Sequence, residues 1–196
     1  MTNTTRFPKL IAFDLDYTLW DLWIDTHVDG PLKRNKNTIN QVLDRYNQPI
    51  SFYRHVADIF HRIRATRLDP SDPNEKVVTA ACSRTHAPDL ANQALRLLLV
   101  PPPANPDEYP GAFTEPTPAI QFFDELEIYP GSKLTHFRKI HERTGIDYSE
   151  MLFFDDEWRN KEVEQLGVVF CHVPAGLNTA KFEEGLTEWR KRTSSS

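Results

Sequence analysis

Short runs of apolar residues recur along this chain, and they constrain the fold more than any other feature. The runs cover residues 9–13, 76–82, 151–154 and 168–173. Continuous apolar runs of this length are typical of strands that are buried on both faces of a sheet. Stretches with helical periodicity separate the runs. The sequence therefore predicts an α/β fold with a parallel sheet, right-handed crossovers and helices on both faces.

The stretches between the predicted strands carry apolar residues at helical spacing. In the segment 55–67, for example, Val56, Ile59, Phe60 and Ile63 fall on one face of a helix. Further helices are predicted over 88–99, from the Gly131-Ser132 pair to Gly145, in a short segment that ends at Gly167, and around Phe182, Leu186 and Trp189.

Two segments lack this periodicity, and we expect them to be irregular. Residues 21–53 are polar, with a candidate hairpin at Asp29-Gly30. Residues 100–118 hold seven of the 15 prolines, which predicts a loop without regular structure that could border the mouth of a site. We expect one domain over residues 1–196, with 21–53 as a flap or loop insertion and no large cap domain.

The composition excludes several classes of protein. With only 7 glycines, the chain contains neither the glycine-rich dinucleotide fingerprint nor a P-loop. A net charge of −5 with scattered basic residues argues against nucleic-acid binding. No apolar run is long enough to span a membrane, and the polar N-terminus does not resemble a secretory signal. Because Cys82 and Cys171 are the only cysteines and lie in apolar segments, we expect a reduced compartment, the cytoplasm or also the nucleus.

Two aspartates follow the first predicted strand. Asp14 and Asp16 stand two residues apart, and Thr18 completes a D-x-D-x-T pattern. Charges at the end of a buried strand are costly unless a cation or a substrate requires them. Taken alone, this pattern also fits an ordinary turn, because aspartate favours turns.

A second acidic group, Asp155-Asp156-Glu157, follows the predicted strand 151–154. Capping of the next helix would also explain these residues. However, the carboxyl ends of parallel strands meet at one edge of a sheet, which is where ligands bind. Carboxylates gathered there repel one another unless a cation neutralises them, and oxygen ligands suit Mg²⁺.

Ser83 and Lys133 complete the set of polar residues at this edge. Ser83 follows the predicted strand 76–82 and can either donate to a phosphate oxygen or cap the next helix. Lys133 begins a predicted helix, where it opposes the helix dipole, although surface lysines also occur at such positions. The four polar groups occur together at the predicted ligand edge, and this joint occurrence supports a functional role for each more strongly than any one group does alone.

This order resembles the four motifs of haloacid dehalogenase (HAD-like) superfamily phosphotransferases. Longer strings resemble the magnesium-dependent phosphatase-1 family: FDLDYTLW, WIDTHVD, SRT, EIYPGSKLTHF and FFDDEWRN. The similarity extends from Pro8 to about Val173. It implies a Rossmannoid three-layer sandwich. The chain departs from compact members of that family in being longer between Thr18 and Tyr53 and in carrying the proline-rich stretch.

The resemblance also implies roles for individual residues. Asp14 would be the nucleophile that forms an aspartyl-phosphate, and Asp16 the general acid and base. Mg²⁺ would be held by Asp14, the main-chain carbonyl of Asp16, and Asp155. The resemblance implies phosphate- or substrate-binding roles for Leu15, Ser83, Arg84 and Lys133. Supporting roles fall to Thr18, Trp20, Asp156 and Asn160.

These roles predict a Mg²⁺-dependent phosphomonoester hydrolase of the acid or protein-tyrosine phosphatase type. Sugar phosphates or fructosamine phosphates are alternative substrates, and Trp20 or Trp23 could line a pocket for an aromatic leaving group. From another class, a phospho-accepting receiver or an inactive phosphate-binding protein would also carry acidic, hydroxyl and lysine groups. We expect a phosphorylated small molecule or phosphotyrosyl protein as the partner, and a monomer.

Overall fold

A five-stranded parallel sheet forms the centre of the computed structural model, which describes residues 6–36, 38–69, 71–72 and 75–193. The strand order is β10-β9-β1-β5-β8, and every neighbouring pair is parallel. The strands are β1 (Leu10–Phe13), β5 (Val78–Ser83), β8 (Glu125–Ile128), β9 (Met151–Asp155) and β10 (Val169–His172).

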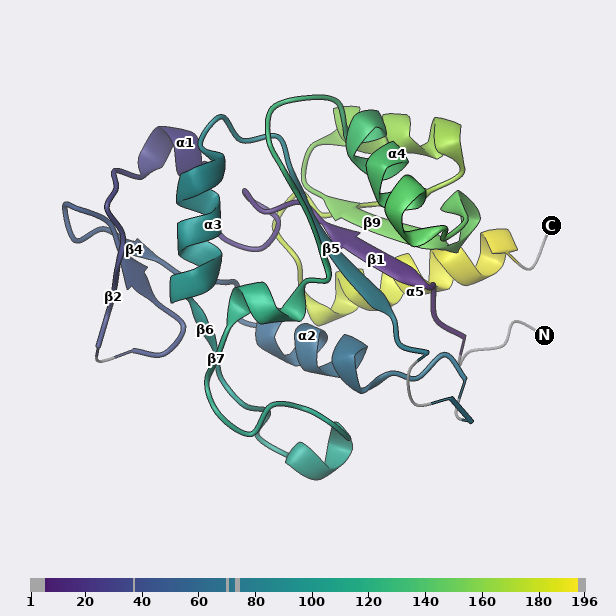
Figure 1. Cartoon of the computed structure of the whole chain (residues 1–196), viewed down its shortest axis with the longest axis horizontal. Helices are drawn as coiled ribbons and strands as arrows, with labels where there is room; N and C mark the ends of the chain where they lie inside the picture. Colours follow the sequence, from purple (N-terminus) through teal and green to yellow (C-terminus); the bar gives the residue numbers. More distant parts are fainter. Residues whose placement is uncertain (1–5, 37, 70, 73–74, 194–196) are drawn as a thin grey trace.

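Helices cover both faces of this sheet, which confirms the predicted three-layer α/β fold (Figure 1). One face packs against α4 (Lys133–Thr144) and the 3₁₀ helix η4 (Trp158–Leu166). The other packs against α2 (Val56–Ala65), α3 (Pro88–Leu97) and α5 (Thr179–Thr193). The remaining helical segments are α1 (Ile24–His27), η1 (Pro106–Glu108), η2 (Ala119–Phe122) and η3 (Tyr148–Glu150). Within the described ranges, no helix combines the length and apolar character needed to cross a bilayer.

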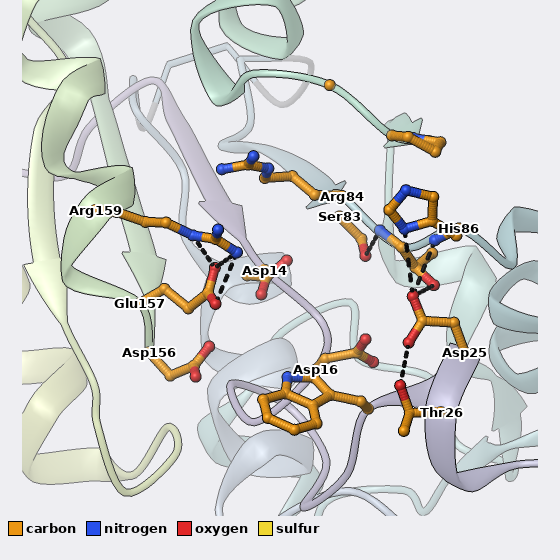
Figure 2. A pocket seen from close by; sticks show the side chains of 14 residues that line it. Asp14, Asp16, Asp25, Thr26, Ser83, Arg84, His86, Asp156, Glu157 and Arg159 are labelled. Atoms are coloured by element: carbon orange, nitrogen blue, oxygen red, sulfur yellow. Dashed lines mark hydrogen bonds and ion pairs between the residues drawn. The ribbon is translucent and has the colours of Figure 1, made fainter.

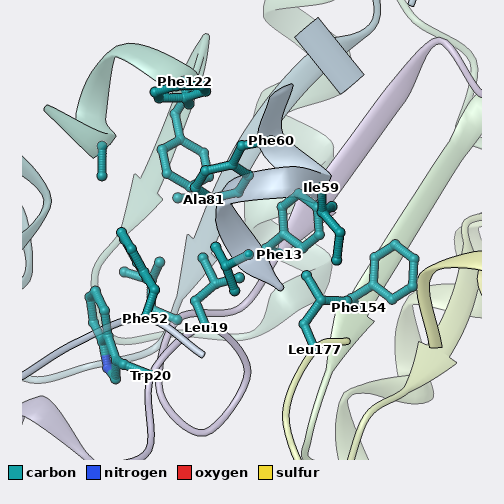
Figure 3. Close-up of a cluster of buried hydrophobic side chains, with 14 of the residues drawn as sticks. Phe13, Leu19, Trp20, Phe52, Ile59, Phe60, Ala81, Phe122, Phe154 and Leu177 are labelled. Atoms are coloured by element: carbon teal, nitrogen blue, oxygen red, sulfur yellow. The ribbon is translucent and has the colours of Figure 1, made fainter. Parts of the chain in front are cut away.

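The alternation of side chains along β1 divides the core into two clusters. Ile11 and Phe13 face α2, α3 and α5, whereas Leu10 and Ala12 face α4 and η4. All four side chains are fully buried, as expected for a strand that is covered on both faces. Figure 3 shows the larger cluster, in which the Phe13 ring stacks on Phe154 at 5.5 Å.

Local signals set the ends of α4 where the sequence predicts them. The Ser132 side chain caps the helix by accepting a hydrogen bond from the amide of Leu134 at 3.0 Å. At the other end, Gly145 adopts a left-handed conformation with φ of 67°, which glycine tolerates without strain. Lys133 is therefore the first residue of the helix.

The sequence predicts only four strands, and β8 is the strand that it does not predict. It lies at an edge of the sheet, beside β5. An edge strand is only partly covered, so its sequence, Glu-Leu-Glu-Ile, alternates charged and apolar residues and contains no apolar run. Arg143 on α4 forms ion pairs with both glutamates, Glu125 and Glu127.

The segment 21–53 is more regular than predicted. After α1 it forms a small antiparallel sheet of β2 (Lys33–Arg34), β3 (Val42–Leu43) and β4 (Pro49–Ile50). The hairpin expected at Asp29-Gly30 is wrong, because the antiparallel pairs join β2 to β3 and β3 to β4, and the second pair reverses at 44–48. At the second reversal the Asp44 carboxylate accepts the amides of Tyr46 and Gln48, both at 2.8 Å. Side-chain bonds thus make the turn where no glycine marks it.

The proline-rich stretch also differs from its prediction. Its two ends form a short antiparallel pair, β6 (Leu99–Val100) with β7 (Thr117–Pro118), and η1 lies between them. The loop packs near α2: the Arg64 guanidinium lies 3.9 Å from the centre of the Phe113 ring and Nε donates to the carbonyl of Gly111. Figure 1 shows this loop projecting beyond α2.

Candidate active site

A cavity of about 440 Å³ lies at the carboxyl edge of the sheet. Figure 2 shows Asp14 between two groups of side chains, with Asp156, Glu157 and Arg159 on one side and Ser83, His86 and Asp25 on the other. The lining residues lie at or just after the ends of β1, β5, β8 and β9, on or beside α1, and on η4. They are Asp14, Asp16, Trp23, Asp25, Thr26, Ser83, Arg84, Thr85, His86, Pro130, Gly131, Asp156, Glu157 and Arg159. None belongs to 100–118, so the expectation that this loop borders the site mouth is wrong.

Lys133 and Asp14 form a buried ion pair at the base of the site. The Lys133 ammonium donates to Asp14 Oδ1 at 2.8 Å and to the carbonyl of Cys82, and it lies 3.0 Å from Asp155 Oδ2. Burial alone would lower the pKa of Lys133, but the carboxylates of Asp14 and Asp155 outweigh burial and raise it. Lys133 is therefore a permanent positive charge.

The charged form of Asp14 remains unfavourable despite this ion pair. Burial raises the pKa of its carboxyl well above the usual range; Lys133 opposes this rise, and the nearby carboxylate of Asp155 adds to it. One ammonium thus faces two buried carboxylates. This imbalance indicates that the site is built for a further positive charge.

Asp155, the last residue of β9, is held by several donors. Asn160 Nδ2 donates to both carboxylate oxygens, at 3.0 and 2.8 Å, and the amide of Glu157 donates to Oδ1 at 2.8 Å. Together with Lys133 close to Oδ2, these donors fix the direction of the carboxylate. Asn160 also accepts from Arg84 at 3.1 Å, which ties Asp155 to the loop after β5.

Asp156 brings a third carboxylate to the site. One oxygen each of Asp14, Asp155 and Asp156 lies within 4.8 Å of the others. Burial raises the pKa of Asp156 to about 6, and the neighbouring carboxylates of Asp155 and Glu157 add to the rise. Three carboxylates against the single ammonium of Lys133 leave net negative charge and an all-oxygen donor set. These residues fit a hard divalent cation such as Mg²⁺.

The carboxylate of Asp16 lies outside this cluster. Trp20 Nε1 donates to Asp16 Oδ1 at 2.7 Å, and the amide of Ile24 also donates to the carboxylate. Burial nevertheless raises the pKa of Asp16 to about 6, because desolvation outweighs both hydrogen bonds. Asp14 and Asp16 therefore occupy different environments although they are two residues apart.

The other predicted residues fall into two groups. Ser83 and Arg84 line the cavity, and Thr18 bonds to Asp156 through its hydroxyl. Leu15 does not line it: its side chain is fully buried in the core, and a ligand could meet only its main chain.

The structure separates the two tryptophans of the sequence analysis. Trp20 is fully buried and does not line the cavity, and its Nε1 donates to Asp16. Trp23 is 47% exposed and lines the cavity, with its ring edge-on to Tyr17 at 5.2 Å and stacked on His27 at 5.7 Å. Trp23 is thus the tryptophan available to a ligand.

Asp25 is a site residue to which sequence reasoning gave no role. It lies on α1, and its carboxylate accepts the amide of His86 at 3.1 Å and the hydroxyl of Thr85 at 3.3 Å. These bonds tie the segment 21–53 to the loop that carries Ser83. The string WIDTHVD contains Asp25, but no spacing rule connects that string with a loop about 60 residues away.

Comparisons with known proteins agree with this geometry. A family model described as Acid Phosphatase matches residues 6–192. A HAD-like hydrolase superfamily protein of Schizosaccharomyces pombe is 46% identical over 170 residues, which cover 87% of this chain and 88% of the relative. Magnesium-dependent phosphatase 1 of Homo sapiens is 38% identical over 187 residues, 95% of this chain and 89% of the relative. A putative magnesium-dependent phosphatase of Saccharomyces cerevisiae is 34% identical over 176 residues, with coverages of 86% and 88%.

The matches span nearly the whole chain, including all four polar segments around the cavity. They confirm the resemblance of the sequence to this phosphatase family. This chain therefore belongs to the acid phosphatase family, within the HAD-like hydrolase superfamily.

Proposed function

We propose that this phosphatase hydrolyses aryl phosphomonoesters, with phosphotyrosyl peptides as the substrate class, through a phosphorylated Asp14 and with Mg²⁺ as cofactor. The observation that carries the proposal is the contrast between two neighbouring carboxylates. Asp14 lies among acids beside Lys133, whereas Asp16 faces Trp20 and has a pKa of about 6. Pairs of carboxyl groups in such different environments are suited to different roles.

Asp14 would act as the nucleophile. One of its oxygens attacks the phosphorus while the bond from phosphorus to the leaving oxygen breaks. Lys133 holds the carboxylate in place and offsets the charge that phosphate brings. Ser83 lines the same cavity and can donate its hydroxyl to a phosphoryl oxygen.

Asp16 would serve first as acid and then as base. In its protonated form it gives a proton to the leaving oxygen. The resulting carboxylate takes a proton from water, whose oxygen attacks the phosphorus and releases phosphate from Asp14. A pKa of about 6 lets the group hold a proton in the first step and lose it readily.

Asp14 and Asp155, with Asp156 beside them, would hold Mg²⁺. The main-chain carbonyl of Asp16 is a further candidate ligand. When bound, Mg²⁺ supplies Lewis-acid stabilisation of charge on the phosphoryl oxygens. The relatives named for magnesium dependence support this assignment.

Trp23 supports an aromatic leaving group. Its half-exposed ring lies at the cavity, where stacking on a phenyl ring would be favourable. The polar residues at the same cavity, Arg84 and Arg159 among them, favour a second candidate, a sugar phosphate or fructosamine phosphate. Trp23→Ala separates the two: it should lower kcat/KM for a phosphotyrosyl peptide and leave that for a sugar phosphate unchanged.

Hydrolysis of 4-nitrophenyl phosphate tests the mechanism. Turnover should require Mg²⁺ and be lost in Asp14→Asn. In Asp16→Asn, 4-nitrophenolate leaves without a proton, so one burst of product per site should precede a steady rate that is lower by about 10²–10⁴-fold. Turnover without metal, or an active Asp14→Asn, would contradict the proposal. A stable phosphorylated parent chain without turnover would favour a receiver, and no phosphorylation at all an inactive binding protein.

A further inference from the structure

His172 makes a hydrogen bond to the main chain of the acidic cluster. It is the last residue of β10, and its Nε2 lies 2.7 Å from the carbonyl oxygen of Asp156. A carbonyl oxygen carries no proton, so the ring nitrogen must be the donor. The bond therefore fixes the ring with its proton on Nε2.

Aromatic neighbours hold the ring of His172 in this direction. Phe170 stacks on it with a centroid distance of 6.3 Å, and Trp158 packs edge-on at 5.3 Å. The Trp158 side chain is itself placed by a contact with Phe170 at 6.0 Å. The two neighbouring rings restrict rotation of the imidazole away from Asp156.

The peptide groups of Asp156 are thus held from both sides. Its amide donates to the hydroxyl of Thr18 at 3.1 Å, and its carbonyl accepts from His172. Next to this bond, the amide of Val173 donates to the carbonyl of Asp155 at 3.0 Å. By contrast, the Asp156 carboxylate accepts a long hydrogen bond of 3.4 Å from the Thr18 hydroxyl and one from its own amide. Its position near Asp14 and Asp155 depends on the main chain more than on bonds of its own.

We propose that His172 is a positioning residue for the Mg²⁺ site, acting through the carbonyl of Asp156. This inference rests on the proposed function. A hydrogen bond that orients the residues of a metal site lowers the cost of bringing them together, and its loss commonly weakens metal binding by about tenfold or more. His172 touches neither substrate nor metal in this role, so its loss should affect metal affinity more than the chemical step.

The test compares variants of the full chain by calorimetric titration of metal-free protein with Mg²⁺ alone. His172→Phe keeps an aromatic ring between Phe170 and Trp158 but removes the donor, and His172→Leu removes the donor without a ring. His172→Gln keeps an N–H donor. The matched control is His141→Phe, because His141 Nδ1 also bonds to a carbonyl at 2.7 Å, that of Ile146, beyond the C-terminal end of α4.

We expect His172→Phe and His172→Leu to raise the Kd for Mg²⁺ by about tenfold, with His172→Gln and His141→Phe close to the parent. Activity should show the same shift in half-saturating Mg²⁺, with kcat at saturating metal little changed. Equal Kd values for the parent and for whichever donor-free variant folds would overturn the inference while the proposed function stands. Weaker binding in His141→Phe as well would overturn it as a general loss of stability. A parent that binds no Mg²⁺ would overturn the proposed function, and this inference with it.

Discussion

The ammonium of Lys133 lies 2.8 Å from Asp14 Oδ1, although 119 residues separate the two along the chain. The contact arises because Asp14 follows the central strand of the sheet and Lys133 begins the helix that packs across it. Both side chains are almost completely buried. In the proposed mechanism, the pair therefore contributes to both stability and catalysis.

Replacing Lys133 should affect both properties. Lys133→Met leaves three carboxylates without the ammonium, so we expect activity to fall by about 10²–10³-fold. Breaking a buried pair on one side destabilises by about 3–5 kcal/mol, and added Mg²⁺ should recover part of this loss because it replaces a positive charge. Urea unfolding with and without Mg²⁺ measures the effect. The control is Lys139→Met on the same helix; similar losses in the two variants would contradict the assignment.

His136 should make stability depend on pH. Burial lowers its pKa from 6.5 to about 4, and the charge of Lys133 adds to this; within the described part of the chain, Nδ1 has no hydrogen-bond partner. Between these pH values the unfolded chain binds a proton that the folded chain does not bind. Stability is therefore greatest above pH 6.5 and falls as the pH drops towards 4, by up to about 3 kcal/mol from this group.

The variant His136→Gln isolates that contribution. The difference in unfolding free energy between pH 7 and pH 4.5 should be smaller in the variant than in the parent. If the unfolding free energies of the parent and His136→Gln change equally with pH, protonation of His136 does not destabilise the folded chain.

Gly185 should resist substitution although it lies within α5. A Cβ atom there would come within 2.6 Å of the Phe154 ring, closer than real contacts allow. Gly185→Ala gains about 1 kcal/mol in helix propensity but overpacks the contact between α5 and β9, which costs about 1–3 kcal/mol. We expect a lower melting temperature, whereas Thr187→Ala on the exposed face of the helix should not lower it. A more stable Gly185→Ala protein would mean that the helix moves away at little cost.

The proline-rich loop should be dispensable for catalysis. It contacts α2 through Arg64 and His61, and η2 through Phe113, and none of its residues lines the cavity. Replacing residues 104–110 with a short glycine-serine linker removes the Tyr109 ring but keeps the contacts of Pro101, Gly111 and Phe113, and it should leave kcat and KM unchanged. Steady-state kinetics on 4-nitrophenyl phosphate and on a phosphotyrosyl peptide would check this. A change in KM for the peptide alone would show that the loop contacts larger substrates outside the cavity.

Much of the fold can be predicted from the sequence, because its signals are local. Four apolar runs predict four of the five sheet strands, and Ser132 and Gly145 predict the ends of α4. The fifth strand, β8, escapes detection because an edge strand needs no continuous apolar run. The reversal at 44–48 is missed for a similar reason, since the side chain of Asp44 makes it without a glycine.

The sequence by itself also determined which residues gather at the site, because parallel strands end at one edge and carry Asp14, Ser83 and Asp155 there. Only the tertiary structure decided which of these side chains are buried, which reach the cavity and which partners they bond. It buries Trp20 and leaves Trp23 at the cavity. It also places His172 against the carbonyl of Asp156. These outcomes depend on packing between segments far apart in sequence, where burial and the direction of each hydrogen bond are set by neighbours that no local pattern specifies.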